Sequence, residues 1–594
     1  MPLSHQERTD LTKFIKKQSL HIDAHIGWEN FSENLKLPDV LVLDIEDIKS
    51  WQQLTKYIYQ TNLSKPIHDR IIVRPAAGGH HRYNDSFSFT PGAMADVIIR
   101  LTGPDFHQVH GDFSSKRCKV GGSVQIGQLE QVLYDHYDLS LPTSSLIPYV
   151  TVAGLTGNAG HGTGLNQPSF AGLILAITFG LENGEIVRID QTHPDFETIR
   201  GAHLGLFGVV LNVELACVEA KKILCILQKR TLPQLLQSIK EGLFDEDPYV
   251  SVMYVPTYQS NELTSDKIKN VDIYRFRPVD KTHKDHSYFP KWSDIEQALE
   301  VFLYEGFRVS DLLRQMPRLV PAYMAYIVSR ISSGLKDHVV IGPWYSMHYQ
   351  LEFPKNITDV DYLFQISPDY HEVNQAITQF VTTLDTFAKQ KKYPITGPTY
   401  LRVFTGTNGG LSTSAHDPNH HTCGFDFVSS PGMPHYEAFR SSMDEFFIKE
   451  LKAKPHWGKY LPKNFPMPFI YGERFAEFRN VLMSWYQSHN LNIERSMFVN
   501  HFFSGMLNLS ELKQKPINFF IMEPAIHANV ISEMAQRFAD SIQENDPIAL
   551  HLKAQLQQAP VIAHSSSWGR FFSVSDTDQS KEPELESKRW CRIA

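Results

Sequence analysis

A glycine-rich run at residues 152–164 constrains this chain more than any other feature. It reads Val-Ala-Gly-Leu-Thr-Gly-Asn-Ala-Gly-His-Gly-Thr-Gly, and a second loop of small residues, Arg74–Asp85, precedes it. Each follows a strand-like stretch, at Tyr149–Val152 and Arg70–Val73 respectively. Glycines lack a Cβ atom, so successive backbone amides can approach a ligand and form an anion-binding concavity. Two such loops suit a ligand with two phosphates and a large planar body. Neither loop has the spacing of a nicotinamide-binding Rossmann turn or a P-loop, which disfavours both.

The composition is that of an ordinary globular protein with ample core: 594 residues, 42% hydrophobic and 21% charged. A net charge of −8 gives no basic footprint for nucleic acid. The N-terminal stretch has no apolar segment typical of a secretory signal, and no apolar run of about 18 residues predicts a membrane span. Five scattered cysteines are typical of reduced intracellular thiols. We therefore expect a cytoplasmic protein, with export through a C-terminal signal left open.

Local patterns divide the chain into successive regions. A strand-like run at 40–43, a helical run at 51–60 and a strand at 70–73 predict a βαβ start. A helix at 129–136 and strands near 171–180, 185–189 and 206–215 follow. Residues 223–460 change character. The patterns there predict long helices, at 293–330, 371–391 and 436–451, and strands near 249–255, 343–353, 398–404 and 422–428.

Several motifs resemble one flavoprotein family. GGHHRYND, TPG, VTVAGLTGNAGHGTG, ENGEIV and GAHLGLFGVVLNVEL occur in the order of the FAD-binding domain of the vanillyl-alcohol oxidase / p-cresol methylhydroxylase family. PHWGK and PITGPTYLRV farther along resemble its sugar-lactone and alditol oxidase branch, with flavin-linked cholesterol oxidases as a near neighbour. The resemblance implies an α+β protein: a two-lobed FAD-binding domain with α/β subdomains (1–222), then an α+β substrate domain with an antiparallel sheet (223–460). A return to the FAD domain (461–505) and an extension with an acidic tail (506–594), predicted to include a helix at 525–543, complete the expected organisation.

The resemblance also implies the residues that hold FAD. Aligning HRYND with the family's HSFND makes His81 the position of covalent flavin attachment, whereas counting glycines favours His80. A glycine at Gly160 would leave room for dioxygen near the flavin, which favours an oxidase. The cofactor-binding residues implied by the resemblance are His81, His80, Arg74, Gly78, Gly79, Gly154, Gly157, Asn158, Gly160, His161, Gly162, Gly208, Val209 and Asn500.

The catalytic residues are expected at three places. Tyr400 and Arg402 are two residues apart on a predicted strand, so their side chains share one face. The resembled oxidases have Glu-x-Arg there, so Tyr400 stands in place of the Glu, and Gln350 occupies a second position where relatives often have Glu. Lys459 would supply positive charge where negative charge develops, making a cationic face together with Arg402. His456 competes with Tyr400 as the group that accepts the hydroxyl proton.

A second set of histidines is best interpreted as a loop. His416, Asp417, His420 and His421 fit no zinc spacing, and Pro418-Asn419 between them indicates a turn, so we expect no metal site.

The expected activity is FAD-dependent oxidation of the CH–OH group of a small-molecule alcohol of the polyol or sugar-lactone class. Dioxygen or another electron acceptor would reoxidise the flavin. Two alternatives stay open. One is an oxidase of sterols or other bulky alcohols. The other is a flavin-binding effector or binding protein with reduced catalysis, which the changed Glu positions and the acidic tail motivate.

Overall fold

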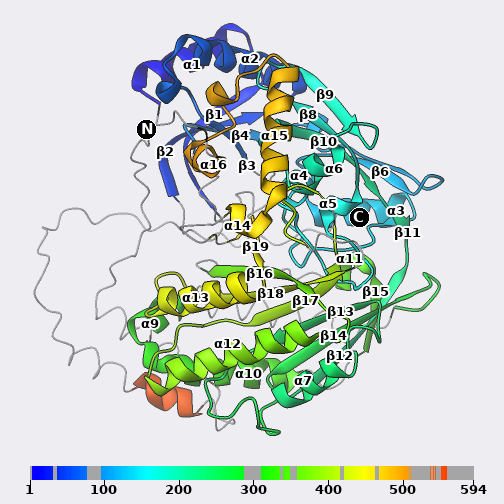
Figure 1. Cartoon of the computed structure of the whole chain (residues 1–594), viewed down its shortest axis with the longest axis vertical. Helices are drawn as coiled ribbons and strands as arrows, with labels where there is room; N and C mark the ends of the chain where they lie inside the picture. The colour runs from blue at the N-terminus through cyan, green and yellow to red at the C-terminus, as the bar shows by residue number, and fades with distance from the viewer. Residues whose placement is uncertain are drawn as a thin grey trace, which may run out of the picture.

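In the computed structural model of the protein, the helices and strands gather into two lobes (Figure 1). The upper lobe in that view holds two sheets from the N-terminal part of the chain, and the lower lobe holds one large sheet with helices packed on it. The structure describes residues 3–30, 36–76, 95–285, 309–334, 339–347, 357–407, 409–414, 420–459, 461, 467–507 and 509, and short stretches between 535 and 557.

The first sheet has the strand order β1-β2-β4-β3. β1 pairs antiparallel with β2, whereas β4 pairs parallel with both β2 and β3. The α2 helix connects β2 with β3 and buries Trp51 and Leu54 against the sheet, so the predicted order of strand, helix and strand is present. The strand expected at 70–73 begins only at Val73. The strands are β1 (Ile22–Glu29), β2 (Lys36–Ile45), β3 (Val73–Ala76) and β4 (Val97–Leu101), and the helix is α2 (Ile48–Ser64).

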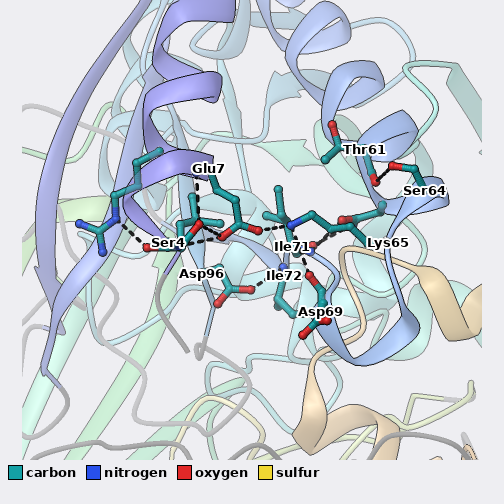
Figure 2. A network of polar contacts seen from close by, with 12 residues as sticks. Ser4, Glu7, Thr61, Ser64, Lys65, Asp69, Ile71, Ile72 and Asp96 are labelled. Carbon is teal, nitrogen blue, oxygen red and sulfur yellow. Dashed lines mark hydrogen bonds and ion pairs between the residues drawn. The ribbon is translucent and has the colours of Figure 1, made fainter.

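The N-terminal helix α1 (His5–Lys17) is fixed to this sheet by the polar network drawn in Figure 2. Ser4 and Glu7 form a capping box that satisfies free N–H groups at the start of the helix. Glu7 also pairs with Lys65, just beyond the end of α2, while Asp96 accepts the Ile72 N–H. Although partial burial raises it, the pKa of Glu7 is lowered to about 2 by hydrogen bonds from Lys65 and Ser4.

The second sheet is antiparallel with the order β5-β6-β10-β8-β9. Its strands are β5 (Val109–Asp112), β6 (Arg117–Gly121), β8 (Ile174–Gly180), β9 (Ile186–Asp190) and β10 (Val209–Ala216). The predicted helix at 129–136 is α3 (Ile126–His136). Two predictions need correction. Tyr149–Val152 makes only an isolated bridge at Thr151 before a helix begins, and the strand expected from residue 171 starts only after a short helix, α5 (Phe170–Leu173).

The large sheet contains eight strands in the order β15-β12-β14-β13-β17-β18-β16-β19, and every pairing is antiparallel, as expected for the second lobe. The strands are β12 (Lys222–Arg230), β13 (Tyr249–Tyr254), β14 (Val271–Val279), β15 (Val339–Pro343), β16 (Thr358–Ile366), β17 (Thr399–Thr405), β18 (His421–Ser429) and β19 (Lys454–Pro455). Helices α7 (Leu232–Lys240), α12 (His371–Lys389) and α13 (Tyr436–Asp444) pack on the face away from the upper lobe. The fold class predicted from the resemblance is confirmed.

Three predicted elements of this lobe differ in the structure. Residues 293–308 of the helix expected over 293–330 lie outside the described residues, and the remainder is interrupted. The α9 helix (Val309–Gln315) ends before Pro317, whose ring and missing N–H break helical hydrogen bonding, and α10 (Val320–Gly334) follows. The strand expected over 343–353 is not present at its start, because β15 ends at Pro343 and α11 (Trp344–Met347) begins there; residues 348–353 lie outside the described residues. The helix expected over 436–451 changes at Glu445 into a π-helix, η5 (Glu445–Glu450).

After the large sheet the chain returns to the upper lobe through α15 (Glu473–Ser488). The segment 495–500 then lies against the first sheet, where Arg70 donates to the Ser496 and Val499 carbonyls and Val73 N–H donates to the Met497 carbonyl. The domain limits at 222, 460 and 505 stay predictions, and the helix expected at 525–543 lies largely outside the described residues. Within the described parts of the chain, no helix has the length and apolar character needed to cross a membrane.

Candidate active site

The two faces of the large sheet differ in chemistry. On β17 and β18, Leu401, Val403, Phe425 and Phe427 point to one face and join the core formed with the helices. Side chains alternate along a strand, so the residues between them point to the opposite face. That face carries Tyr400, Arg402, Phe404 and Asp426, and on β16 it carries Asp359 and Asp361. The sequence thus places an apolar face on the helices and a charged face toward the glycine run.

Register aligns three of these residues in a row across the sheet. Tyr400 on β17 lies directly opposite Asp426 on β18, and Asp426 lies directly opposite Asp361 on β16. Opposed residues of an antiparallel pair have Cβ atoms about 4.5–5.5 Å apart. The two aspartates are buried, and Arg402 has its Nη2 atom 3.7 Å from Asp426 Oδ2. The expected common face of Tyr400 and Arg402 is therefore present.

Lys459 joins the carboxylates of this face. Its Nζ atom pairs with Asp426, and it lies 3.1 Å from Asp359 Oδ2 and 3.6 Å from Asp361 Oδ2. Burial alone would lower the pKa of Lys459, but the three carboxylates raise it above its ordinary range. The expected cationic face of Arg402 and Lys459 must accordingly be corrected, because the lysine charge is already neutralised by aspartates.

The glycine run begins as a helix and ends as an extended segment on the large sheet. Thr151 caps α4 (Val152–Gly157) by accepting the Gly154 N–H, and beyond it Gly164 N–H donates to the Val403 carbonyl at 2.8 Å. Gly164 also forms a parallel bridge with Phe404. The first half of the run is therefore a short helix and not the loop that the sequence suggested. Its second half is the contact through which the upper lobe meets β17.

His161 lies at this contact and crosses to the charged face. Its Nε2 atom is 3.1 Å from Asp361 Oδ2, and its ring stacks on Phe404 with centroids 4.6 Å apart. Burial lowers the pKa of His161 and outweighs the hydrogen bond to Asp361. Gly424 on β18 makes the room, since a Cβ there would lie 2.9 Å from His161 Cε1. The glycine run thus carries an ionisable group into the row of aspartates.

Close packing explains several predicted cofactor-binding glycines. A Cβ on Gly157 would lie 2.7 Å from His203 Cε1, one on Gly160 would collide with Leu155, and one on Gly162 with the Ser144 carbonyl. Since the missing Cβ of Gly160 points at Leu155, packing accounts for this glycine without the room for dioxygen that the sequence suggested. Gly208 has φ of +145°, a left-handed value that favours glycine, and Val209 begins β10 beside Gly180.

His456 is buried beside the row and lacks the character of a base. Its Nδ1 atom accepts the Gly458 N–H at 2.9 Å, and burial lowers its pKa to about 3. A neutral imidazole whose Nδ1 accepts carries its proton on Nε2, where it can only donate. The hypothesis that His456 accepts the hydroxyl proton is therefore disfavoured by its surroundings.

Two predicted cofactor-binding residues bind backbone of the return segment. Arg74 donates to the carbonyls of Leu204 at 2.8 Å and Phe498 at 2.9 Å, and its guanidinium lies over the Phe503 ring. Asn500 caps helix α16 (His501–Met506) by accepting the Phe503 N–H. The predicted residues outside the described part of the chain are Gly78, Gly79, His80, His81 and Gln350.

Asp359, Asp361 and Asp426 were not among the residues predicted from the sequence, although the sequence contains a signal for them. Asp359 and Asp361 stand two residues apart in a strand otherwise rich in apolar residues, and Asp426 stands between Phe425 and Phe427. A charged residue in such a strand is costly to bury unless it is paired, which marks it as a residue with a function or a partner.

The second set of histidines, which the sequence indicated as a loop, lies only partly within the described residues. His421 begins β18 and is therefore a strand residue, whereas His416 and Asp417 lie outside the described residues. No group of three potential ligands among the described residues could hold a metal ion.

Comparison with known proteins confirms the resemblance. The L-gulonolactone oxidase of Bos taurus is 29% identical over 177 residues, which are 29% of this chain and 36% of that enzyme. The alditol oxidase of a Streptomyces species (strain IKD472) is 30% identical over 142 residues, 24% of this chain and 32% of that enzyme. The aligned region of this chain thus spans well under two thirds of either relative. No protein-family model matches the chain.

The fold has solved counterparts. The crystal structure of cholesterol oxidase from B. sterolicum superposes with a TM-score of 0.65 and covers 82% of this chain and 98% of its own, at 14% sequence identity. The superposition establishes a shared fold, and at this sequence identity it establishes the fold alone. The predicted neighbourhood of lactone and alditol oxidases, with cholesterol oxidase nearby, is therefore confirmed.

Proposed function

We propose that this protein is an FAD-dependent oxidoreductase that oxidises the CH–OH group of a small-molecule alcohol of the polyol or sugar-lactone class. The observation that carries the proposal is the charged row Tyr400–Asp426–Asp361, with Arg402 and Lys459, on the sheet face that meets the glycine run. Sequence similarity to lactone and alditol oxidases favours this substrate class.

The residues around the glycine run fit a large polar cofactor. Asn158 Oδ1 and Thr143 Oγ1 are buried without a hydrogen-bond partner among the described residues, although buried polar groups are generally paired. Asn158 follows α4 directly, and Thr143 lies beside Gly162. These residues, with the part of the glycine run that follows α4, would hold FAD, which when bound supplies the hydride acceptor.

The residues of the charged face have separable tasks in this reaction. The Arg402 guanidinium is permanently charged and would stabilise negative charge that develops on the substrate oxygen. Lys459 holds Asp426 in place, while His161 holds Asp361. Their burial excludes water, which strengthens every electrostatic interaction at the site.

The test is the visible spectrum of the purified protein, followed by anaerobic addition of alditols, sugar lactones and sterols. We expect bound flavin that is bleached by an alditol or a lactone. Peroxide formation on admitting air would identify dioxygen as the acceptor. Protein that takes up no FAD would refute the proposal, and flavin that no alcohol bleaches would favour a binding or effector protein.

Oxidation of a sterol or another bulky alcohol is the second candidate. The similarity of the whole fold to cholesterol oxidase, over 98% of that chain, favours it. Bleaching by cholesterol but by no alditol or lactone would decide for this candidate.

We infer covalent flavin attachment through His81, with His80 as the alternative. The support is the match of HRYND to the family's HSFND. Flavin fluorescence should stay with the denatured chain in a gel, and His81→Ala should abolish it while His80→Ala keeps it. Loss in the His80 variant alone would reverse the assignment, and a wild type without fluorescence would refute the linkage.

A further inference from the structure

The sheet retains a carboxylate beside the position where the resembled oxidases have Glu. That position is Tyr400 on β17, and directly opposite it on β18 stands Asp426. Opposed residues of an antiparallel pair point to the same face, so Asp426 projects toward the glycine run beside Tyr400 and Arg402. The carboxylate is therefore displaced by one strand and is not lost.

Asp426 has one oxygen held and one oxygen free to react. Its Oδ2 atom pairs with Lys459 and lies 3.7 Å from Arg402 Nη2. Its Oδ1 atom is buried without a hydrogen-bond partner among the described residues. A carboxylate fixed through one oxygen, with lone pairs open on the other, has the geometry of a proton acceptor.

Burial is the main reason why the pKa of Asp426 lies above its ordinary range. Burial raises the pKa of Asp426 to about 7; Lys459 opposes the rise, while Asp361 and Asp359 add to it. A catalytic base works best with a pKa near the operating pH. The titratable and charged groups around Asp426 are Tyr400 and Arg402 on β17, Asp359 and Asp361 on β16, Lys459 and His456 after β19, and His161 from the glycine run.

The other candidates at the site are less suited to accept a proton. His456 uses Nδ1 to accept the Gly458 N–H, and both ring nitrogens of His161 face acceptors, Asp361 and the Gly162 carbonyl. Asp361 Oδ1 is also buried without a hydrogen-bond partner among the described residues, but Asp361 lies one strand farther than Asp426 from Tyr400 and Arg402. Burial alone would raise the pKa of Asp361, but Lys459 and His161 bring it far below its ordinary range, which makes it a weak base. Lys459 stays charged between its carboxylates.

We propose that Asp426 accepts the proton of the substrate hydroxyl group, held by Lys459, with Tyr400 opposite it as a positioning residue. The inference rests on the proposed function. The O–H bond breaks and its proton goes to Asp426 Oδ1. The C–H hydrogen leaves with its electron pair as hydride to the oxidised flavin, and the carbon–oxygen bond becomes a carbonyl, so that the alcohol is oxidised and the flavin reduced.

The test compares Asp426→Asn with Asp272→Asn in protein loaded with FAD. Asp272 is a matched control, because it is also a buried aspartate paired with a lysine, Lys229 at 2.9 Å, on the same sheet. We expect Asp426→Asn to slow anaerobic flavin reduction roughly 10²- to 10⁴-fold, the usual contribution of a general base. The flavin spectrum of Asp426→Asn should be unchanged. Asp426→Glu should recover part of the rate of flavin reduction, and Asp272→Asn should keep the wild-type rate.

A second measurement needs no substrate. The infrared difference spectrum between pH 8 and pH 6 should contain carboxyl signal that titrates near neutral pH. Burial also raises the pKa of Glu182 to about 7, so Asp426→Asn should remove one part of this signal and Glu182→Gln another. In the wild type the rate of flavin reduction should fall as the pH drops through the same range, because protonated Asp426 cannot accept a proton. The Asn variant should lose this inflection.

The outcomes separate the inference from the proposed function. A wild type whose flavin no alcohol reduces refutes the function and the inference with it. If an alcohol reduces the flavin of the wild type and that of Asp426→Asn at the same rate, the inference alone is overturned. A neutral-pH carboxyl signal that keeps its full wild-type intensity in the Asn variant overturns it as well.

Discussion

His161 and Asp361 connect the two lobes through one buried hydrogen bond, with His161 Nε2 3.1 Å from Asp361 Oδ2. The histidine comes from the glycine run and the aspartate from β16, 200 residues away in the sequence. Gly424 is the residue that lets them meet, because any side chain there would occupy the space of the imidazole. The geometry of the site therefore depends on a position that carries no functional group.

Gly424→Ala should destabilise the protein by about 1–3 kcal/mol, the usual cost of overpacking a close-packed site. The added Cβ would lie 2.9 Å from His161 Cε1 and 3.3 Å from Asp361 Oδ1, so the hydrogen bond must lengthen. Urea denaturation measures the change. The matched control is Gly505→Ala in α16, where a Cβ meets no atom within 4 Å and alanine should stabilise the helix. Equal stability of wild type and Gly424→Ala would contradict the packing assigned to His161.

Two buried histidines should each contribute stability that is lost as the pH drops below about 6.5, because they stay neutral in the folded protein, whereas the raised pKa values of Asp426 and Glu182 act in the opposite direction over the same range. Burial lowers the pKa of His203 and of His456 to about 3, from an ordinary 6.5. Below pH 6.5 the unfolded chain binds these protons and the folded chain does not, so stability present at higher pH is lost as the pH falls toward 3. Each histidine should remove about 1.4 kcal/mol between pH 7.5 and pH 5.5.

Guanidinium denaturation at these two pH values measures the loss. His203→Gln should shift the stability difference between pH 7.5 and pH 5.5 by the contribution of one histidine, whereas His25→Gln, on the exposed strand β1, should leave the difference unchanged. A His203→Gln protein with the full wild-type pH dependence would show that His203 is protonated in the fold.

Arg74→Met should destabilise the attachment of the return segment by about 3 kcal/mol, since charge-assisted hydrogen bonds to the buried Leu204 and Phe498 carbonyls are lost. The rate of amide hydrogen exchange of residues 495–500 should rise in this variant. Arg117→Met, on the exposed side of β6, is the control. Loss of FAD with normal protection of 495–500 would instead favour the predicted role of Arg74 in cofactor binding.

Arg402→Met should slow anaerobic flavin reduction by about 10²- to 10³-fold, the usual effect of removing a group that stabilises developing negative charge. Bound FAD should be retained. In the control Arg230→Met, on β12 of the same sheet, the flavin should be reduced at the wild-type rate, because among the described residues that side chain donates only to the neighbouring Lys229 carbonyl. Unchanged flavin reduction in Arg402→Met would move the site away from this face.

The sequence by itself determined the elements and the chemistry available to them. Alternating residues placed Tyr400 and Arg402 on one face of β17, and helical periodicity placed α12 within a few residues of its limits. These properties are local, since they depend on backbone geometry over a few residues. The motifs around the glycine run identified the fold because their order along the chain is itself a property of the sequence.

Only the tertiary structure decided which residues meet. Asp361 and Asp426 become neighbours through strand register, and Lys459 and His161 join them from distant segments. Neutralisation of Lys459 by three carboxylates, and the single tautomer imposed on His456 by Gly458, follow from those contacts and from burial. Charge interactions depend on distance and on exclusion of water, and neither is set until the lobes pack together.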